Sequence, residues 1–274
     1  MSRDRSPIIP AAHFLPAITA SAANRAAAAA ANASELWAAA RRAPRPRSLV
    51  GALGRPAMRD PNASPIAPIA IIAECKAKSP SQGRLVPDYD PVARARAYEQ
   101  GGARALSVLT EPDFFDGDLE HLRAVAEGAG VPVLRKDFLL EPAQVAEARA
   151  HGADAVLAIV RILTEAQLAA LLAAASELAM DVLVEVHSRE ELARAAAAGA
   201  TLVGVNNRDL DTFDTKLARA LDLAPALPPH ATAVAESGIR TAEDLSRLAD
   251  AGYHAALVGQ ALMQEGTALL GVSR

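Results

Sequence analysis

The stretch IIAECKAKSPSQG, residues 71–83, carries the side chains best suited to chemistry. Glu74 and Lys76 stand two residues apart at the end of an apolar run. On a β-strand, residues i and i+2 point to the same face, so this carboxylate and this ammonium would share one space while Cys75 faces away. A buried charge pair costs desolvation energy and stabilises a fold poorly. We therefore predict that this strand end belongs to an active site; a structural salt bridge is the alternative.

Three more apolar runs contain or precede ionisable side chains. Lys136 follows VPVL, Glu185 lies within VLVEV, and Glu236 ends TAVAE. Lysines and carboxylates that converge keep one another ionised and can split their pKa values for acid and base work. A solvated charge run at Lys136 and an exposed edge strand at Glu185 are the alternatives. The apolar neighbours of both residues favour an inward position.

Further polar residues follow other predicted strands. Asn206, Asn207 and Arg208 come directly after LVGV, where the two asparagines could also be turn formers. His187 shares the face of Glu185 only if that strand runs on, but Ser188 already looks like a helix start, so we interpret His187 as a loop residue behind the site. The histidines show no mutual spacing typical of metal ligands, and we expect no metal.

Small-residue turns follow the last two predicted strands. Ser237 and Gly238 come after one of them, and Gly259 and Gln260 after the other. Backbone N–H groups in such turns, with a helix start behind them, can cradle a phosphate. The pair of turns predicts a substrate that is a phosphate ester.

The elements that must position these residues form a repeat. From Ala70 onward a short apolar run, a polar loop and a helical pattern recur about every 25 residues. Helix starts are signalled by Pro91, Thr164, Ser188 and Thr241. We predict strands at 70–75, 105–110, 131–136, 155–160, 182–187, 202–207, 232–236 and 255–259. We predict helices near 91–100, 117–128, 142–150, 164–179, 189–198, 215–223, 241–250 and 261–270.

Eight such units predict an α/β fold, a closed (β/α)8 TIM barrel, over residues 70–274. The alternative is a doubly wound open sheet, but no G-x-G-x-x-G fingerprint follows the first strand. Residues 1–69 are Ala-rich and then Pro-rich, with too few large apolar residues for a core of their own. We predict that they form a helical N-terminal extension packed on the barrel.

Composition narrows the classes of partner and location. The net charge is −4 without a long basic run, which argues against nucleic acid as a partner. The sequence contains no apolar stretch long enough to predict a membrane span. The single cysteine excludes an internal disulfide and fits a reducing compartment. The start of the chain only faintly resembles a signal peptide. We expect a cytoplasmic protein, a monomer or weak homodimer.

Taken together, the motifs resemble those of the indole-3-glycerol-phosphate synthase family, over about residues 70–264 and more loosely upstream. The family motifs occur in order and with the expected spacing. They are IIAECKAKSPSQG, SVLTEPDFFDG (107–117), VPVLRKDF (131–138), GADAVLAI (152–159), LVEVHSREEL (183–192), VGVNNRDL (203–210), AESGI (235–239) and LVGQALM (257–263).

The resemblance implies an enzyme that closes an indole ring on 1-(2-carboxyphenylamino)-1-deoxyribulose 5-phosphate with loss of carbon dioxide and water, without metal or organic cofactor. Lys136 would be the general acid and Glu185 a general base or a stabiliser of the cationic intermediate. Lys76 would hold the substrate carboxylate or act as acid in the dehydration, and both roles stay open. Residues implied to orient or bind the substrate are Glu74, Asn206, Glu236, Ser237, Ser79, Phe115 and Arg208, with Gly238, Gly259 and Gln260 at the phosphate.

The chain also departs from the family pattern. Ala77-Lys78 reverses a common order of basic residues, and Gln260 stands where a small or acidic residue is common, so only a main-chain contact is implied there. The Ala-rich N-terminus replaces charged helices. Other readings are a phosphate-binding barrel isomerase and a non-catalytic barrel paralogue. The loop from Ser79 to Asp88 is the predicted lid, because it follows a site strand and contains Gly83.

Overall fold

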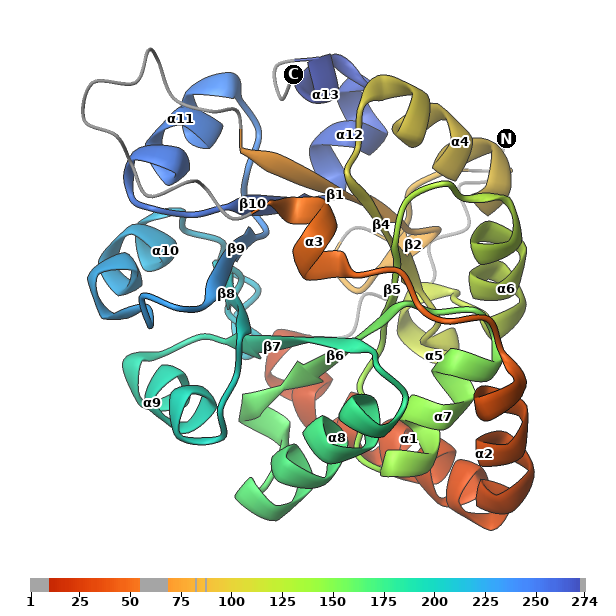
Figure 1. Ribbon diagram of the computed structural model, residues 1–274. Helices are drawn as coiled ribbons and strands as arrows, with labels where there is room; N and C mark the ends of the chain where they lie inside the picture. Colours follow the sequence, from red (N-terminus) through yellow and green to blue (C-terminus); the bar gives the residue numbers. More distant parts are fainter. Residues whose placement is uncertain (1–9, 55–68, 82, 87, 272–274) are drawn as a thin grey trace.

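The strands of the protein form a closed parallel barrel (Figure 1). The computed structural model describes residues 10–54, 69–81, 83–86 and 88–271. Within these residues eight parallel strands close in the order β1-β10-β9-β8-β7-β6-β5-β4. This confirms the predicted TIM barrel and excludes the open sheet. The barrel strands are β1 (Ala70–Cys75), β4 (Ala105–Leu109), β5 (Val133–Lys136), β6 (Ala155–Ile159), β7 (Asp181–Val186), β8 (Leu202–Asn206), β9 (Thr232–Glu236) and β10 (Ala255–Val258).

Helices form an outer ring around the barrel, and several of them begin at the capping residues that the sequence predicted. Thr164 and Thr241 each form a capping box with the residue three positions on, and Pro91 occupies the first turn of its helix. The ring consists of α4 (Pro91–Gly101), α6 (Leu119–Gly128), α7 (Pro142–Ala150), α8 (Glu165–Glu177), α9 (Arg189–Ala197), α10 (Ala218–Leu223), α11 (Ala242–Asp250), α12 (Gln260–Glu265) and α13 (Ala268–Gly271).

Several predicted bounds were wrong by a few residues. The helix expected near 117–128 begins at Leu119, because the Asp118 carboxylate caps it, and a separate short helix α5 (Pro112–Phe115) precedes it. The helix expected near 215–223 begins only at Ala218, and the strand expected from 131 begins at Val133. The last predicted helix is divided at Gly266, whose φ of 71° is left-handed and ends α12.

The loops carry short elements that the sequence did not predict. The predicted lid starts as an antiparallel pair of β2 (Lys78–Ser79) and β3 (Gly83–Arg84). Within that loop Gln82 and Pro87 lie outside the described residues. Two 3-10 turns, η1 (Val160–Ile162) and η2 (Ala224–Ala226), follow β6 and α10.

The barrel strands are buried on both faces. Side chains inside the barrel fill it, and the helices cover its outside, so the strands read as continuous apolar runs. Cys75 is fully buried, among the small and branched residues of this core. The low aromatic content of 3% therefore reflects a core of Ala, Val, Leu and Ile.

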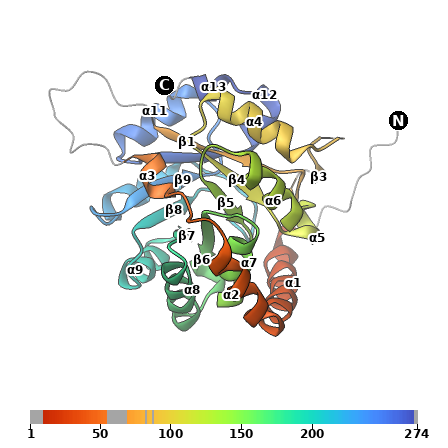
Figure 2. The ribbon, with the colours of Figure 1, turned by 45° about the vertical axis from the view of Figure 1, so that its right-hand side comes forward.

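The N-terminal part of the chain wraps around the barrel. Helices α1 (Ala11–Ala31) and α2 (Ala33–Arg42) pack on α7 (Figure 2). Helix α3 (Leu49–Leu53) lies over one end of the barrel (Figure 1), where the Val50 N–H donates to Asp181 at the start of β7. Residues 55–68, next to the predicted boundary at 69, lie outside the described part. None of the helices in the described ranges is long and apolar enough to cross a membrane.

Candidate active site

One pocket at the carboxyl ends of the strands collects every residue that the sequence predicted for the site. Parallel strands of a barrel all end at the same rim, so polar residues at the ends of different strands converge there. Glycine at position 259 leaves room for the side chain of Glu74, because a β-carbon on Gly259 would overlap the Glu74 carboxylate. The predicted residues that line the pocket are Glu74, Lys76, Ser79, Phe115, Lys136, Glu185, Asn206, Arg208, Glu236, Ser237, Gly238, Gly259 and Gln260.

The centre of the pocket is an ammonium between two carboxylates. Lys136, at the end of β5, places Nζ 3.1 Å from Oε2 of Glu185 and 3.6 Å from Oε2 of Glu236. Both glutamates are almost fully buried, at the ends of β7 and β9. Burial works against the charge of Lys136, but Glu185, Glu236 and Glu74 outweigh it and raise the pKa of the ammonium. Lys136 is therefore held protonated.

The two carboxylates beside Lys136 differ in charge. Burial opposes ionisation of Glu185, but the charges of Lys136 and His187 and the amide of Asn206 lower its pKa to about 2. For Glu236, burial and then the charge of Glu185 raise the pKa well above the ordinary value, and Lys136 only partly offsets this. The two neighbouring carboxyl groups thus have pKa values shifted in opposite directions, so Glu185 gives up its proton more readily and Glu236 keeps its proton more readily.

Glu74 and Lys76 meet as the i, i+2 pattern predicted. The Lys76 Nζ donates to Oε1 of Glu74 at the rim above β1, and both side chains line the pocket. Burial acts to raise the pKa of Glu74, but the charges of Lys76 and Lys136 outweigh it and lower that pKa. Four charged groups from β1, β5 and β7 therefore alternate in sign around the rim.

The asparagines after β8 divide between the pocket and the scaffold. Asn206 lines the pocket, and its Oδ1 accepts from the backbone N–H of Arg208 at 3.0 Å. Asn207 is fully buried and turned away; its amide donates to the carbonyl of Ser237 at 3.0 Å. Arg208 reaches back to the lid, where its Nη1 lies 3.4 Å from Oγ of Ser81.

The turns after the last two strands form one end of the pocket. Ser237 and Gly238 take left-handed φ values of 66° and 73°, which turns the chain sharply and brings its backbone to the pocket. A β-carbon on Gly238 would collide with Thr215 of the neighbouring loop. Gly259 follows β10 and Gln260 opens α12 at the same end. These residues can offer main-chain N–H groups to an anion.

An aromatic wall forms another part of the pocket. The chain has five phenylalanines, and all of them gather in one cluster around Phe14 of α1. The Phe14 ring centre lies 5.1 to 6.4 Å from those of the other four. Those that also line the pocket are Phe14, Phe115, Phe138 and Phe213.

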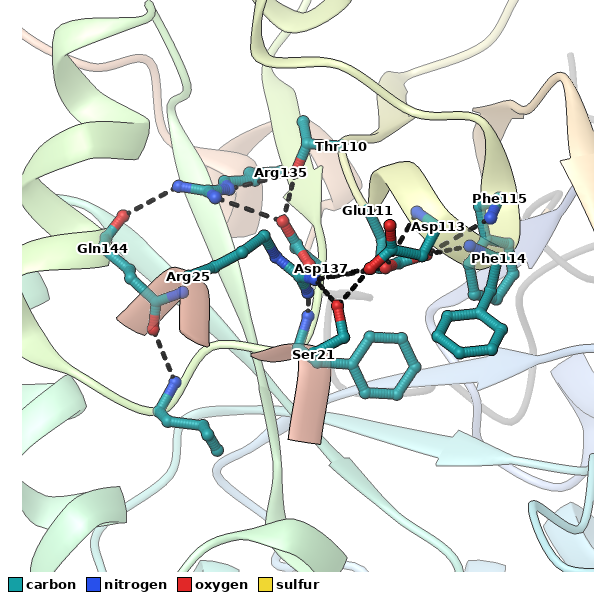
Figure 3. A network of polar contacts seen from close by, with 12 residues as sticks. Ser21, Arg25, Thr110, Glu111, Asp113, Phe114, Phe115, Arg135, Asp137 and Gln144 are labelled. Carbon is teal, nitrogen blue, oxygen red and sulfur yellow. Dashed lines mark hydrogen bonds and ion pairs between the residues drawn. The ribbon is translucent and has the colours of Figure 1, made fainter. Parts of the chain in front are cut away.

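Helix α1 is tied to this wall by a guanidinium (Figure 3). Arg25 donates to Oε1 of Glu111 at 3.1 Å and to Oδ1 of Asp137 at 3.0 Å. Glu111 in turn accepts the N–H groups of Phe114 and Phe115, and Asp137 accepts that of Phe138. Arg25 therefore joins the loops after β4 and β5, which carry Phe115 and Phe138 of the aromatic wall, next to Lys136.

Sequence reasoning missed the contribution of α1. Phe14 and Arg25 lie in an Ala-rich helix without a motif, so nothing local marks them. The scarcity of aromatic residues was the one available signal for Phe14, since a large ring in such a helix needs a partner. His187 was placed correctly behind the site, but its contact with Glu185 was not foreseen.

The fold and the pocket together define a (β/α)8-barrel enzyme with an acid–base site at the carboxyl ends of its strands. The profile of the family "Indole-3-glycerol phosphate synthase" matches residues 15–270. The chain belongs to this family.

Similar proteins carry the same family name. The indole-3-glycerol phosphate synthase of Chlorobium luteolum is 52% identical over 194 residues, 71% of this chain and 74% of that protein. The one of Mycolicibacterium gilvum is 46% identical over 233 residues, 85% of this chain and 82% of that protein. A solved structure described as "Native KDPGal structure" shares the fold alone, with a TM-score of 0.52 and 16% identity over 74% of this chain and 91% of that one.

Proposed function

We propose that the protein converts 1-(2-carboxyphenylamino)-1-deoxyribulose 5-phosphate into indole-3-glycerol phosphate, with loss of carbon dioxide and water. The observation that carries the proposal is the place of Lys136. Its ammonium lies between Glu185 and Glu236, in a pocket with an aromatic wall and with small-residue turns at one end. An aromatic amine joined to a sugar phosphate needs both kinds of surface and an acid between them.

The first step joins the aromatic ring to the sugar. The ring carbon that bears the carboxylate attacks the ketone carbon of the ribulose chain, and the carbonyl oxygen gains negative charge. Lys136 donates its proton to that oxygen, which becomes a hydroxyl group. Because the pKa of Lys136 is raised by its carboxylate neighbours, the group is protonated before the step begins.

The later steps restore the aromatic system. The carboxylate leaves as carbon dioxide and returns its bonding electrons to the ring, and then the hydroxyl group leaves as water. Glu185, the ionised carboxylate, stabilises the cationic intermediate and accepts the proton that leaves C1 of the ribulose chain as water departs. Lys76, paired with Glu74, holds the substrate carboxylate or protonates the leaving hydroxyl group. Asn206, Glu236 and Ser237 orient these groups and the substrate.

The two ends of the substrate meet different surfaces. The carboxyphenyl ring would pack on Phe115 in the aromatic wall, and Ser79 and Arg208 would reach its polar groups from the lid side. The phosphate would accept main-chain N–H groups of Gly238, Gly259 and Gln260. Arg240, which also lines this part of the pocket, adds positive charge near the phosphate.

Two alternatives fit the pocket less well. An isomerase of an aminated ribulose phosphate needs one acid and one base, and it has no use for Lys76, Lys136 and three glutamates. A non-catalytic barrel would not need to keep a lysine and two glutamates together in its interior, which costs stability.

The test of the proposal is direct. The purified protein is incubated with the carboxyphenylamino-deoxyribulose phosphate, and indole absorbance and fluorescence are followed. We expect turnover without added metal or cofactor. The proposal fails if micromolar enzyme yields no indole product. Formation of an isomeric sugar phosphate instead would favour the isomerase.

A cytoplasmic location and a monomeric or weakly dimeric state belong to the same proposal. The single cysteine, Cys75, is buried and free, as a reducing compartment allows. Cell fractionation and sedimentation of the purified protein at several concentrations test these two points.

A further inference from the structure

His187 lies directly behind the central carboxylate of the pocket. The side chain follows β7, is 1% exposed, and places Nε2 3.4 Å from Oε1 of Glu185. The other oxygen of Glu185, Oε2, is the one that faces Lys136. Glu185 is therefore held on two sides, by a lysine in the pocket and by an imidazole outside it.

The position of His187 is set from α9. Glu191, in the first turn of that helix, accepts the backbone N–H of His187 at 2.7 Å through Oε2. The same oxygen lies 3.2 Å from Nδ1 of the ring. A proton on Nδ1 is thus directed at Glu191, and this leaves Nε2 to face Glu185.

Other charged groups surround this line of contacts. Arg161 of η1 lies 3.1 Å from Oε1 of Glu191 and 3.0 Å from Asp211, in the loop after β8. On the pocket side, Lys136 faces Glu185 and Glu236. His187 itself stands between two carboxylates, so its doubly protonated ring can donate to both of them.

The proposed reaction creates a need for a second positive charge at Glu185. When Lys136 gives its proton to the substrate, the lysine becomes neutral and the buried carboxylate loses its partner in the pocket. A buried carboxylate without a partner takes up a proton. Glu185 would then no longer be available as a base for the later step.

We propose that His187 is a positioning residue for Glu185, whose imidazolium holds the carboxylate in place and keeps it ionised while Lys136 is neutral. The carboxylate of Glu191 orients the ring and stabilises its positive charge. No bond forms or breaks at His187: the proton on Nε2 stays on the ring, and Nε2 lies 3.4 Å from Oε1 of Glu185. The kinetic part of this inference rests on the proposed function.

Lys136→Met tests the inference without turnover, because this variant imitates the neutral lysine. The infrared absorption of protonated carboxyl groups is titrated with pH in Lys136→Met and in Lys136→Met/His187→Asn. Addition of Glu185→Gln to each background identifies the band of Glu185. We expect the apparent pKa of Glu185 to be higher by at least about one unit in the double variant, since an opposite charge is lost. Equal values would overturn the inference.

Two single variants provide the kinetic test. Asn at 187 keeps a donor near Nδ1, for Glu191, whereas Gln keeps one near Nε2, for Glu185. We expect His187→Asn to lower kcat about tenfold or more with little change in KM. We expect His187→Gln to recover only part of this loss of kcat, because Gln restores the donor but not the positive charge. Equal kcat in Asn, Gln and wild-type proteins would contradict the inference, as would full recovery of kcat by Gln, which carries no positive charge. If wild-type protein forms no indole, the proposed function fails and the infrared comparison still decides the role of His187.

Discussion

Arg25 and Asp137 form an ion pair that joins two segments 112 residues apart in the sequence. The distance between Nη2 of Arg25 and Oδ1 of Asp137 is 3.0 Å, and the aspartate side chain is 1% exposed. Because Asp137 directly follows Lys136, the N-terminal helix touches the catalytic rim through this contact. The extension is thus part of the pocket and more than a cover of the barrel.

Replacement of Arg25 tests this contact. Arg25→Ala would leave the carboxylates of Glu111 and Asp137 buried with one positive partner fewer, which typically costs about 2–4 kcal/mol. Urea unfolding measures this loss, and kcat should fall as well, since both loops of the aromatic wall loosen. The control is Arg41→Ala, whose pair with Glu177 is exposed at 61% and 52% and contributes about 0–1 kcal/mol. Equal effects of the two variants would show that the ion pairs of Arg25 with Glu111 and Asp137 are unimportant.

Lys136→Ala should abolish turnover and leave phosphate affinity nearly intact. The acid and the small-residue turns lie on different strands, so the loss of one leaves the other in place. General acids contribute about 10²–10⁴ in rate. Turnover is measured with substrate, and the affinity for inorganic phosphate by calorimetry. The exposed Lys216 supplies the control, Lys216→Ala. More than about a tenth of the wild-type rate in Lys136→Ala, a loss below ~1.4 kcal/mol, would refute the general-acid role.

Glu236→Gln should change the pH dependence of stability. Burial and Glu185 raise the pKa of Glu236 in the folded protein above its unfolded value. As the pH rises through the unfolded value, the unfolded chain releases a proton that the folded chain keeps, so stability falls until the folded pKa is reached. The free energy of unfolding falls by about 1.4 kcal/mol per pH unit in this window.

The glutamine variant lacks this loss. The stability difference between Glu236→Gln and wild type should therefore grow in favour of the variant from pH 5 to pH 8, while turnover falls. Urea unfolding at both pH values provides the measurement. A difference that stays constant with pH would mean that Glu236 is ionised in the folded protein.

The loop from Ser79 to Asp88 should be protected by a bound substrate analogue. Ser79, Ser81 and Leu85 line the pocket, and the Arg84 guanidinium lies 2.6 Å from Asp116 in the loop after β4. An analogue between these loops would hold them closed. Trypsin cleaves after Arg84, so slower cleavage there is the expected result, with inorganic phosphate alone as the control. Unchanged cleavage would count against a lid.

Much of the fold was predictable because the relevant signals are local. Parallel strands buried on both faces read as apolar runs, and Thr164 and Thr241 mark helix starts by capping chemistry. The errors fall where backbone geometry decides, as at Gly266, whose left-handed conformation ends a helix that the composition would have continued.

The pocket residues on the strands were predictable for a similar reason. In a closed parallel barrel the carboxyl ends of all strands lie at the same rim, so Lys136 and Glu185 had to converge once the barrel was recognised. The charge state of each group was not predictable in this way. Glu185 and Glu236 are both buried glutamates at strand ends, yet the charges of Lys136 and His187 outweigh burial at Glu185 and lower its pKa, whereas burial and the charge of Glu185 raise the pKa of Glu236.

The sequence by itself determined the barrel, the family and the set of ionisable residues at one rim, because strand period, helix caps and i, i+2 spacing act over short distances. Only the tertiary structure decided that Phe14 of the N-terminal helix lines the pocket, that Arg25 ties this helix to the loops beside the pocket, and that His187 lies against Glu185. Those contacts depend on how α1 docks across the loops after β4 and β5 and on how α9 turns Glu191 toward His187. Such docking is set by packing between distant segments, which leaves no local pattern in the chain.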